Sequence, residues 1–372
     1  MMKITELRLQ NFRNYDQASI NFSAPLNLLV GENAQGKTNL AEGIFLLTLG
    51  RSFRTNKVAS LISYDQTEAM IGGKIEYSNK QQQLGVRLSK KVGQKRAFYL
   101  AGEQVTAKDF FGQFLAVVFR PRDVSELCLN PAWRRNLLDY ILCLVWPGYF
   151  QDLVTFRRVL RSRNALLSRL GEHAAQTDQL LFWDEELLRL AAEISRARFD
   201  LVEHYATSLP YYYQQLSGEQ GGLTVRHHTQ VAGEEDLRSN WRAVLAANWA
   251  QEKRLGFTIS GPHRDDLSFK LANRSLRENG SGGEWRSVLL ALKLAEADYL
   301  YKQRGERAVI LLDDVLSELD LKRREALLGQ LEGYQSFITT TEVPSFLVAT
   351  NKIEIKQVQQ GKVFSNLVGS HD

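Results

Sequence analysis

The chain has 372 residues and a formal net charge of +5, and 44% of its residues are hydrophobic and 10% aromatic. This length and composition are typical of a globular protein with two or three domains, or with one domain that carries a large insertion. No apolar run approaches the length of a membrane span, so we do not expect a membrane-spanning protein. Met1–Leu7 lacks the apolar core of a secretion signal, so we do not expect a secreted protein.

The chain contains two cysteines, Cys128 and Cys143, and neither belongs to a C-x-x-C pair. A disulfide framework or a zinc site is therefore not indicated. We expect a cytoplasmic protein with no membrane partner. The positive charge favours a polyanionic partner only weakly, since many basic proteins bind nothing anionic.

Alternating apolar residues predict two or three strands over residues 3–30. The last strand leads into a G-x-x-x-x-G-K-T sequence, and helical spacing follows at residues 39–47. Strand, loop and helix are the context of a phosphate-binding P-loop, in which glycines let successive N–H groups face phosphate oxygens. Lys37 would reach the β- and γ-phosphates, and Thr38 would ligate Mg²⁺. The predicted ATP-binding residues are Gly31, Glu32, Asn33, Ala34, Gln35, Gly36, Lys37 and Thr38.

Two basic segments are candidate DNA contacts. Arg51, Arg54 and Lys57 lie in a loop after the P-loop helix, where they could meet DNA phosphates, the nucleotide itself or only solvent. Lys90 and Lys91 lie in a hairpin of a predicted small antiparallel lobe at residues 69–100. Lysines there could equally protect an exposed strand edge from aggregation.

The middle of the chain changes character after a predicted buried strand at residues 115–119. Helical spacing dominates residues 131–254 and predicts an inserted all-helical arm, in which Pro210 interrupts a long helix. Strands are predicted to resume at residues 256–260. The expected domains are the first part of a head with its β lobe (1–130), the helical arm (131–255) and the second part of the head (256–372).

Two further motifs complete the predicted nucleotide site. Ser281, Gly282 and Gly283 precede a strong helix and form a second anion-binding cap. An apolar strand at residues 307–314 ends in two carboxylates, which is the Walker B pattern. Asp313 would hold the Mg²⁺ ion and Asp314 would polarise or orient the attacking water, so Asp314 and Lys37 are the candidate catalytic residues.

The order of these motifs resembles the ABC-type ATPase head, and several segments resemble the RecF family of bacterial DNA repair proteins, which is related to the SMC heads. The most specific segments are Gly261–Leu267 and Leu312–Asp320, and similar ones occur along almost the whole chain. The resemblance implies an α/β fold, an ABC-type P-loop head with a mixed sheet and an antiparallel β lobe. It also implies an ATP-dependent homodimer, in which the Ser281–Gly283 cap contacts the ATP bound by the second copy.

The same resemblance implies a clamp on single-stranded and double-stranded DNA at gaps or junctions, with slow ATP hydrolysis. RecR-type and RecO-type partners would help it to load recombinase during repair and replication. Two alternatives remain open, the nucleotide-binding subunit of an ABC transporter and a regulatory DNA-binding module that has lost hydrolysis. The long helical insertion and the turn at residues 261–266 argue against the transporter.

The chain departs from the usual family pattern at three places, and a fourth difference concerns ABC-type ATPases in general. Ser281-Gly-Gly-Glu284 replaces S-Q-G-Q, which puts a negative charge near the facing phosphates unless Glu284 points away. Arg120 and Arg122 stand in a segment that usually reads F-S-P-E-D, and Phe53 replaces a usual histidine. Thr339–Thr341 occupy the place where ABC-type ATPases put a γ-phosphate sensor, usually histidine.

Overall fold

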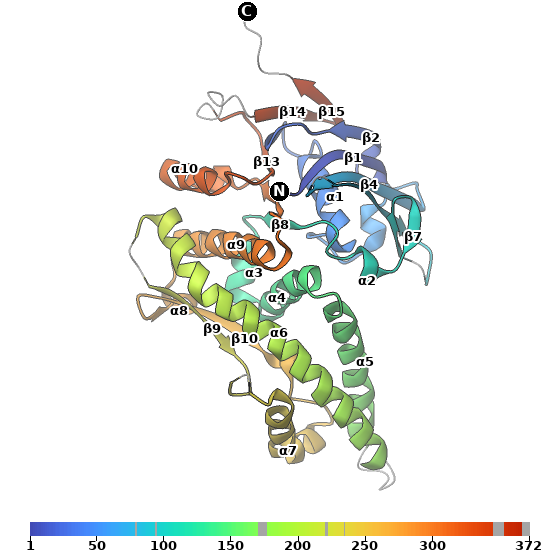
Figure 1. Ribbon diagram of the computed structural model, residues 1–372, viewed down its shortest axis with the longest axis vertical. Helices are drawn as coiled ribbons and strands as arrows, with labels where there is room; N and C mark the ends of the chain where they lie inside the picture. The colour runs from blue at the N-terminus through green and yellow to red at the C-terminus, as the bar shows by residue number, and fades with distance from the viewer. Residues whose placement is uncertain are drawn as a thin grey trace, which may run out of the picture. The chain divides into compact units, whose positions relative to one another are not determined.

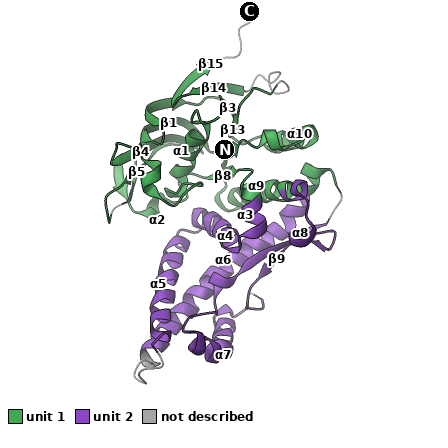
Figure 2. Ribbon diagram, turned by 180° about the vertical axis from the view of Figure 1, so that it is seen from behind, with its two compact units in different colours: residues 1–124, 212–219, 286–372 green, residues 125–211, 220–285 purple. Residues whose placement is uncertain are grey.

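The computed structural model describes residues 1–78, 80–93, 95–169, 177–219, 222–233, 235–344 and 353–366, and it divides into two compact units (Figure 2). Unit 1 comprises residues 1–124, 212–219 and 286–372. Unit 2 comprises residues 125–211 and 220–285. In the part of the chain that the structure describes, no helix has the length and apolar character needed to cross a membrane.

Unit 1 contains a six-stranded antiparallel sheet (Figure 1). Its strand order is β2-β1-β4-β5-β6-β7. The strands are β1 (Lys3–Phe12), β2 (Tyr15–Asn21), β4 (Glu68–Tyr77), β5 (Lys80–Ser89), β6 (Arg96–Leu100) and β7 (Glu103–Val105). This sheet confirms the predicted antiparallel lobe and adds the first two strands of the chain to it.

The second sheet of unit 1 is mainly parallel and has the order β15-β14-β3-β13-β12-β8. Only β15 runs antiparallel to its neighbour. The strands are β3 (Leu26–Val30), β8 (Ala116–Phe119), β12 (Val309–Asp313), β13 (Ser336–Thr340), β14 (Ile353–Gln359) and β15 (Lys362–Asn366). The predicted P-loop and Walker B strands therefore lie in one sheet, with β13 between them.

Helix α1 (Lys37–Leu49) contacts strands of both sheets and is the central helix of unit 1. All of its residues except Thr38 and Asn39 are buried, so it has no solvent-facing side, as expected for a helix inside a core. Unit 1 also contains η1 (Val58–Leu61), α2 (Ala107–Phe110), η4 (Leu316–Glu318), α10 (Leu321–Gln330) and most of α9 (Gly282–Arg304).

Unit 2 is a set of helices with a small sheet of order β11-β10-β9. The helices are α3 (Asp123–Leu129), α4 (Pro131–Val145), α5 (Tyr149–Leu167), α6 (Thr177–Ser217), α7 (Leu237–Leu255), η3 (Pro262–Arg264) and α8 (Leu276–Asn279), of which α3 and α6 each extend into unit 1. The strands are β9 (Leu223–His228), β10 (Asp266–Leu271) and β11 (Arg274–Ser275).

Three predictions for this region are wrong. The arm is not all-helical, because β9 lies inside the range 131–255 and pairs with β10. Residues 256–260 form no strand. Pro210 does not interrupt the long helix, since α6 continues through it to Ser217.

The boundary expected at residue 256 is also displaced. Residues 256–285 cluster with unit 2, because β10 pairs along its whole length with β9 of the predicted arm. The pairing of β10 with β9 thus decides to which unit these residues belong, although β10 lies outside the predicted arm in the sequence.

Candidate nucleotide-binding site

The P-loop connects β3 to α1 and depends on two close backbone approaches. Gly36 caps α1 with a φ of 118°, and a Cβ there would lie 2.8 Å from Asn14 Nδ2 and 3.0 Å from the Tyr15 hydroxyl. A Cβ on Gly31 would lie 2.3 Å from the Val358 carbonyl oxygen. Only glycine fits at these two positions, and the N-terminus of α1 that follows them is a site where anions can bind.

Lys37 is buried, with only 4% of its surface exposed. Its ammonium donates to the carbonyl oxygens of Gly31 and Glu32, at 2.6 and 2.9 Å. An ammonium has three N–H donors, so one remains for an anion at the mouth of the loop. The cation is thus held in place by backbone before any phosphate arrives.

Thr38 and Asp313 lie side by side although 275 positions separate them in the chain. The Thr38 hydroxyl donates to Asp313 Oδ1 at 2.7 Å, and the Thr339 hydroxyl donates to the same oxygen at 3.0 Å. Burial raises the pKa of Asp313, and the hydrogen bonds from Thr38 and Thr339 oppose that rise. Hard oxygen ligands on adjacent strand and helix ends fit Mg²⁺, which would favour the charged carboxylate.

Asp314 follows β12 in a left-handed conformation with a φ of 55°. Its N–H donates to the Thr339 hydroxyl at 2.8 Å, and that hydroxyl lies 3.4 Å from Asp314 Oδ1. Thr339 therefore contacts both carboxylates of the Walker B pair and positions them. This contact gives Thr339, the first residue of the run Thr339–Thr341, a role in orienting the two carboxylates.

Glu42 is a site residue that the sequence reasoning missed. It is fully buried on α1 and accepts hydrogen bonds from Arg13 Nε and Nη2, at 2.8 and 2.9 Å, and from the Ser52 hydroxyl. Arg13 is therefore bound to Glu42. Ser52 belongs to the loop at residues 51–57, which we call the basic loop, and it links this loop to the same carboxylate. The available signal was a single acid among Leu40, Ala41, Ile44 and Phe45 in the P-loop helix.

The basic loop is also linked to the P-loop by a chain of hydrogen bonds. Arg54 Nη1 donates to Asn39 Oδ1 at 2.7 Å, and Asn39 Nδ2 donates to Asn14 Oδ1 at 2.8 Å. Asn14 Nδ2 then donates to the Gln35 carbonyl at 3.1 Å. Any group that binds Arg54 is therefore two side chains away from the phosphate-binding loop.

The other candidate DNA contacts are spread over unit 1. Arg51 and Lys57 are exposed. Burial lowers the pKa of Arg96 in β6, and the nearby charge of Arg51 lowers it further. Lys90 donates to two backbone carbonyls, at 3.0 and 3.3 Å, and Lys91 lies 3.9 Å from Glu68. Lys90 is thus held by the backbone of residues 63 and 64, and Glu68 partly compensates the charge of Lys91.

Two of the departures from the family pattern contact each other. The Arg120 guanidinium lies 5.0 Å from the centre of the Phe53 ring and donates to the Phe53 carbonyl oxygen. It also pairs with Asp123, and both charged side chains are buried. Arg120 therefore fastens the basic loop to the end of β8.

Ser281 and Glu284 form a capping box at the start of α9. The Ser281 hydroxyl accepts from the Glu284 N–H at 3.2 Å, and a Glu284 carboxylate oxygen accepts from the Ser281 N–H at 2.7 Å. Arg274 pairs with the same carboxylate. The backbone hydrogen bond from Ser281 and the contact with Arg274 lower the pKa of Glu284. The charge of Glu284 is thus compensated within unit 2, where Gly282 and Gly283 form the first turn of the helix.

Comparison with known proteins decides the family. Residues 3–363 match the family model described as RecF/RecN/SMC N terminal domain. The DNA replication and repair protein RecF of Enterococcus faecalis is 35% identical over 378 residues, covering 98% of this chain and 99% of that protein. The chain belongs to the RecF family.

Other RecF proteins and structures agree. RecF of a Synechococcus strain is also 35% identical, over 99% of both chains. A solved structure described as the recombination mediator protein RecF-ATP in the RecFOR pathway superposes with a TM-score of 0.89 at 30% identity, covering 98% of both chains. The Smc head domain of Pyrococcus furiosus, at 16% identity and a TM-score of 0.56, shares the fold. The ABC-type head fold predicted from the motifs is thereby confirmed.

Proposed function

We propose that this RecF-family protein is an ATP-dependent DNA-binding clamp of recombinational repair and replication. The observation that carries the proposal is the meeting of Lys37, Thr38 and Asp313 at one edge of the parallel sheet. This arrangement provides a cation for phosphate oxygens and two oxygen ligands for Mg²⁺. The relative whose structure is described as RecF-ATP has the same fold over nearly its whole length.

Slow ATP hydrolysis is the second part of the proposal. Asp314 would orient the attacking water, and Thr339 would hold that carboxylate in place. Replacement of the usual histidine sensor by a hydroxyl suits a slow timer better than a fast motor. The alternative of a module that has lost hydrolysis predicts ATP binding without turnover in the presence of DNA.

Dimerisation by ATP is the third part. The P-loop already encloses one side of the phosphates, so the anion-binding cap of α9 would bind the nucleotide held by a second copy. Because Arg274 and the Ser281 N–H bind Glu284, its negative charge would not oppose the facing phosphates. Hydrolysis would then release the dimer from DNA.

For DNA we propose the basic loop as the main contact, with Arg51, Arg54 and Lys57 facing the phosphates. The support is its link to the nucleotide site through Asn39 and Glu42, which would let DNA and ATP influence each other. Gaps and junctions are the proposed targets, with RecR-type and RecO-type partners helping to load recombinase. A solved relative is described as part of the RecFOR pathway.

The test is the binding of a fluorescein-labelled gapped duplex, followed by anisotropy at fixed salt with and without ATP and Mg²⁺. For the unmodified protein we expect ATP to tighten binding by about tenfold, a usual size for coupling between two ligands. Lys37→Ala should remove this response, and the exposed Lys322→Ala on α10 should retain it. If the Lys37 variant responded to ATP like the unmodified protein, gating by this site would be wrong.

A further inference from the structure

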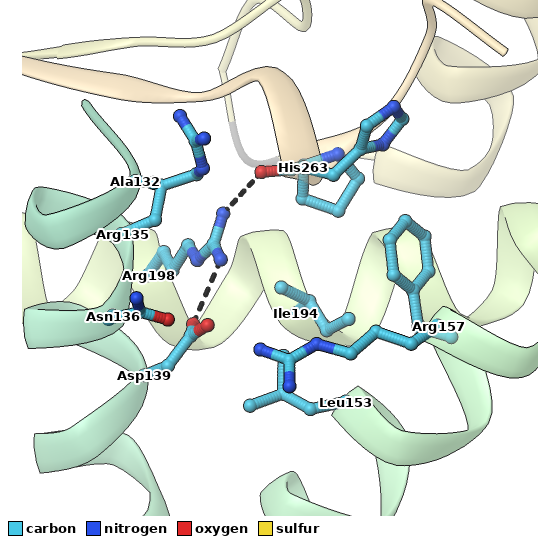
Figure 3. Close-up of a pocket in the computed structure, with 11 residues that line it drawn as sticks. Ala132, Arg135, Asn136, Asp139, Leu153, Arg157, Ile194, Arg198 and His263 are labelled. Atoms are coloured by element: carbon cyan, nitrogen blue, oxygen red, sulfur yellow. Dashed lines mark hydrogen bonds and ion pairs between the residues drawn. The ribbon is translucent and has the colours of Figure 1, made fainter. Parts of the chain in front are cut away.

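Unit 2 contains a polar pocket of about 210 Å³ between α4, α5, α6 and η3 (Figure 3). Pockets for whole small molecules usually measure about 300–1,000 Å³, so this one suits a single functional group. The residues that the argument uses are Ala132, Arg135, Asp139, Arg157, Arg198 and His263.

Three arginines line the pocket against one carboxylate. Asp139 accepts from Arg198 Nη2 at 2.8 Å and from the Tyr149 hydroxyl at 2.7 Å. Arg198 Nη1 donates to the Pro262 carbonyl and to Asp265, at 2.6 and 2.9 Å. The single acid of the lining is therefore already bound, and it leaves Arg135 and Arg157 without a carboxylate of their own in the pocket.

Arg198 lies in the middle of the pocket and is 3% exposed, yet its Nε makes no hydrogen bond among the described residues (Figure 3). Arg135 donates through Nη1 to the Asp265 carbonyl at 2.8 Å. Burial, and then the charge of Arg198, lower the pKa of Arg135, and Asp266, Asp265 and Asp139 oppose that shift. The lining itself contains three arginines and one aspartate, so its positive charge is not fully compensated. Buried donors of this kind are costly unless a ligand binds them.

His263 adds a neutral group to the wall. Burial lowers its pKa to about 4, and its Nδ1 has no partner among the residues described. His263 Nε2 lies 3.3 Å from the Thr258 carbonyl oxygen, which can only accept, so the neutral imidazole donates there and its Nδ1 is left as an acceptor. The acids and cations that face the pocket are thus Asp139 and three arginines, with Asp265 behind them.

Helix geometry adds to the positive field. Ala132 and Arg135 belong to the first turns of α4, whose N-terminal end carries partial positive charge. On α5, the exposed Arg161 lies one turn beyond Arg157 on the same face of the helix. A cationic path therefore leads along this helix to the mouth of the pocket, which is what a polyanion backbone would follow.

We propose that this pocket binds one phosphate group. Its guanidinium donors come from three helices and so point in different directions, which suits a tetrahedral oxyanion better than a planar carboxylate. The phosphate could belong to a DNA backbone, an assignment that rests on the proposed function, or to a free phosphate ion. The experiments below separate the two sources.

The first experiment titrates inorganic phosphate into the full-length protein by calorimetry, with ADP and Mg²⁺ saturating the P-loop. Arg157→Gln removes one donor, and Ala132→Asp adds a negative charge at the mouth. An acid in the first turn stabilises a helix, so loss of binding by Ala132→Asp cannot be ascribed to unfolding of α4. Arg158→Gln is the matched control, because it removes a neighbouring exposed arginine that does not line the pocket.

We expect the affinity for phosphate to fall by about tenfold or more in Arg157→Gln and Ala132→Asp, as for the loss of a charged hydrogen bond, and to stay unchanged in Arg158→Gln. Absence of phosphate binding in the unmodified protein, or equal losses in all three variants, would overturn the proposal.

The second experiment measures the salt dependence of binding to a gapped duplex. If DNA supplies the phosphate, the slope of log K against log salt should become shallower by about 0.9 in Arg157→Gln and Ala132→Asp, but less in Arg158→Gln. Phosphate binding with unchanged slopes would assign the pocket to a free phosphate and reject the DNA source. Failure of the unmodified protein to bind DNA would reject the proposed function, while the phosphate titration would still decide the pocket.

Discussion

Glu42 shows how one buried residue joins two parts of the site. Its carboxylate lies on the central helix and binds Arg13 from the β1–β2 turn and Ser52 from the basic loop. Buried carboxylates are retained in proteins when their partners satisfy them, and removing one partner exposes the full cost of burying the other. The P-loop helix and the basic loop therefore depend on one another.

Replacing this carboxylate should be costly. We expect Glu42→Ala to lower the free energy of unfolding by about 3 kcal/mol, at the lower end for a buried ion pair because Arg13 is partly exposed. Urea titration followed by circular dichroism measures the change. The double variant Glu42→Leu with Arg13→Met should recover most of it, since both charges are then absent. A loss below about 1 kcal/mol in Glu42→Ala would contradict the role of Glu42, because that is the size of an exposed pair.

The chemical residues of the site were largely predictable, whereas those that position them were not. The motif pattern predicted one site for Lys37, Thr38 and Asp313, which the structure brings together, because phosphate and metal chemistry restricts residue types at fixed spacing. Glu42 and Thr339 act through partners distant in the sequence, and one chain carries no signal for such pairing. Arg120 and Phe53 were noted as departures, but their mutual contact requires the fold.

At the scale of elements, α9 begins with a capping box that overlaps the proposed anion-binding cap Ser281–Gly283. Gln is the other residue that completes a capping box, so Glu284→Gln should preserve the cap and the helix. We expect ATP-dependent dimerisation of this variant to stay within about threefold of the unmodified protein, because Arg274 already compensates the charge. Sedimentation velocity at several ATP concentrations measures this. Much tighter dimerisation in the Gln variant would mean that Glu284 does face the phosphates.

The wrong predictions at residues 256–260 and at Pro210 have physical explanations. Residues 256–260 alternate like a strand, but Asn164 accepts from the Thr258 N–H, and Glu252 accepts from the N–H groups of Ile259 and Ser260. Side chains thus replace the partner strand. Pro210 is tolerated inside α6 because Leu209 and Tyr213 on either side are fully buried, so packing holds the helix together across it.

At the scale of the whole molecule, the central claim is that ATP brings two copies of the chain together through the cap of α9. Ser281→Arg places a bulky cation at that cap without touching the P-loop, so it should spare ATP binding and prevent assembly. Lys37→Ala should prevent both.

Light scattering of the purified protein, with and without ATP and Mg²⁺, tests this claim most directly. The account predicts a monomer of 42.4 kDa that doubles in mass when ATP and Mg²⁺ are added, and a Ser281→Arg variant that binds ATP but remains a monomer. An unmodified protein that binds ATP and stays monomeric, with or without a gapped duplex, would contradict the composite site and favour a DNA-binding module that works as a single copy.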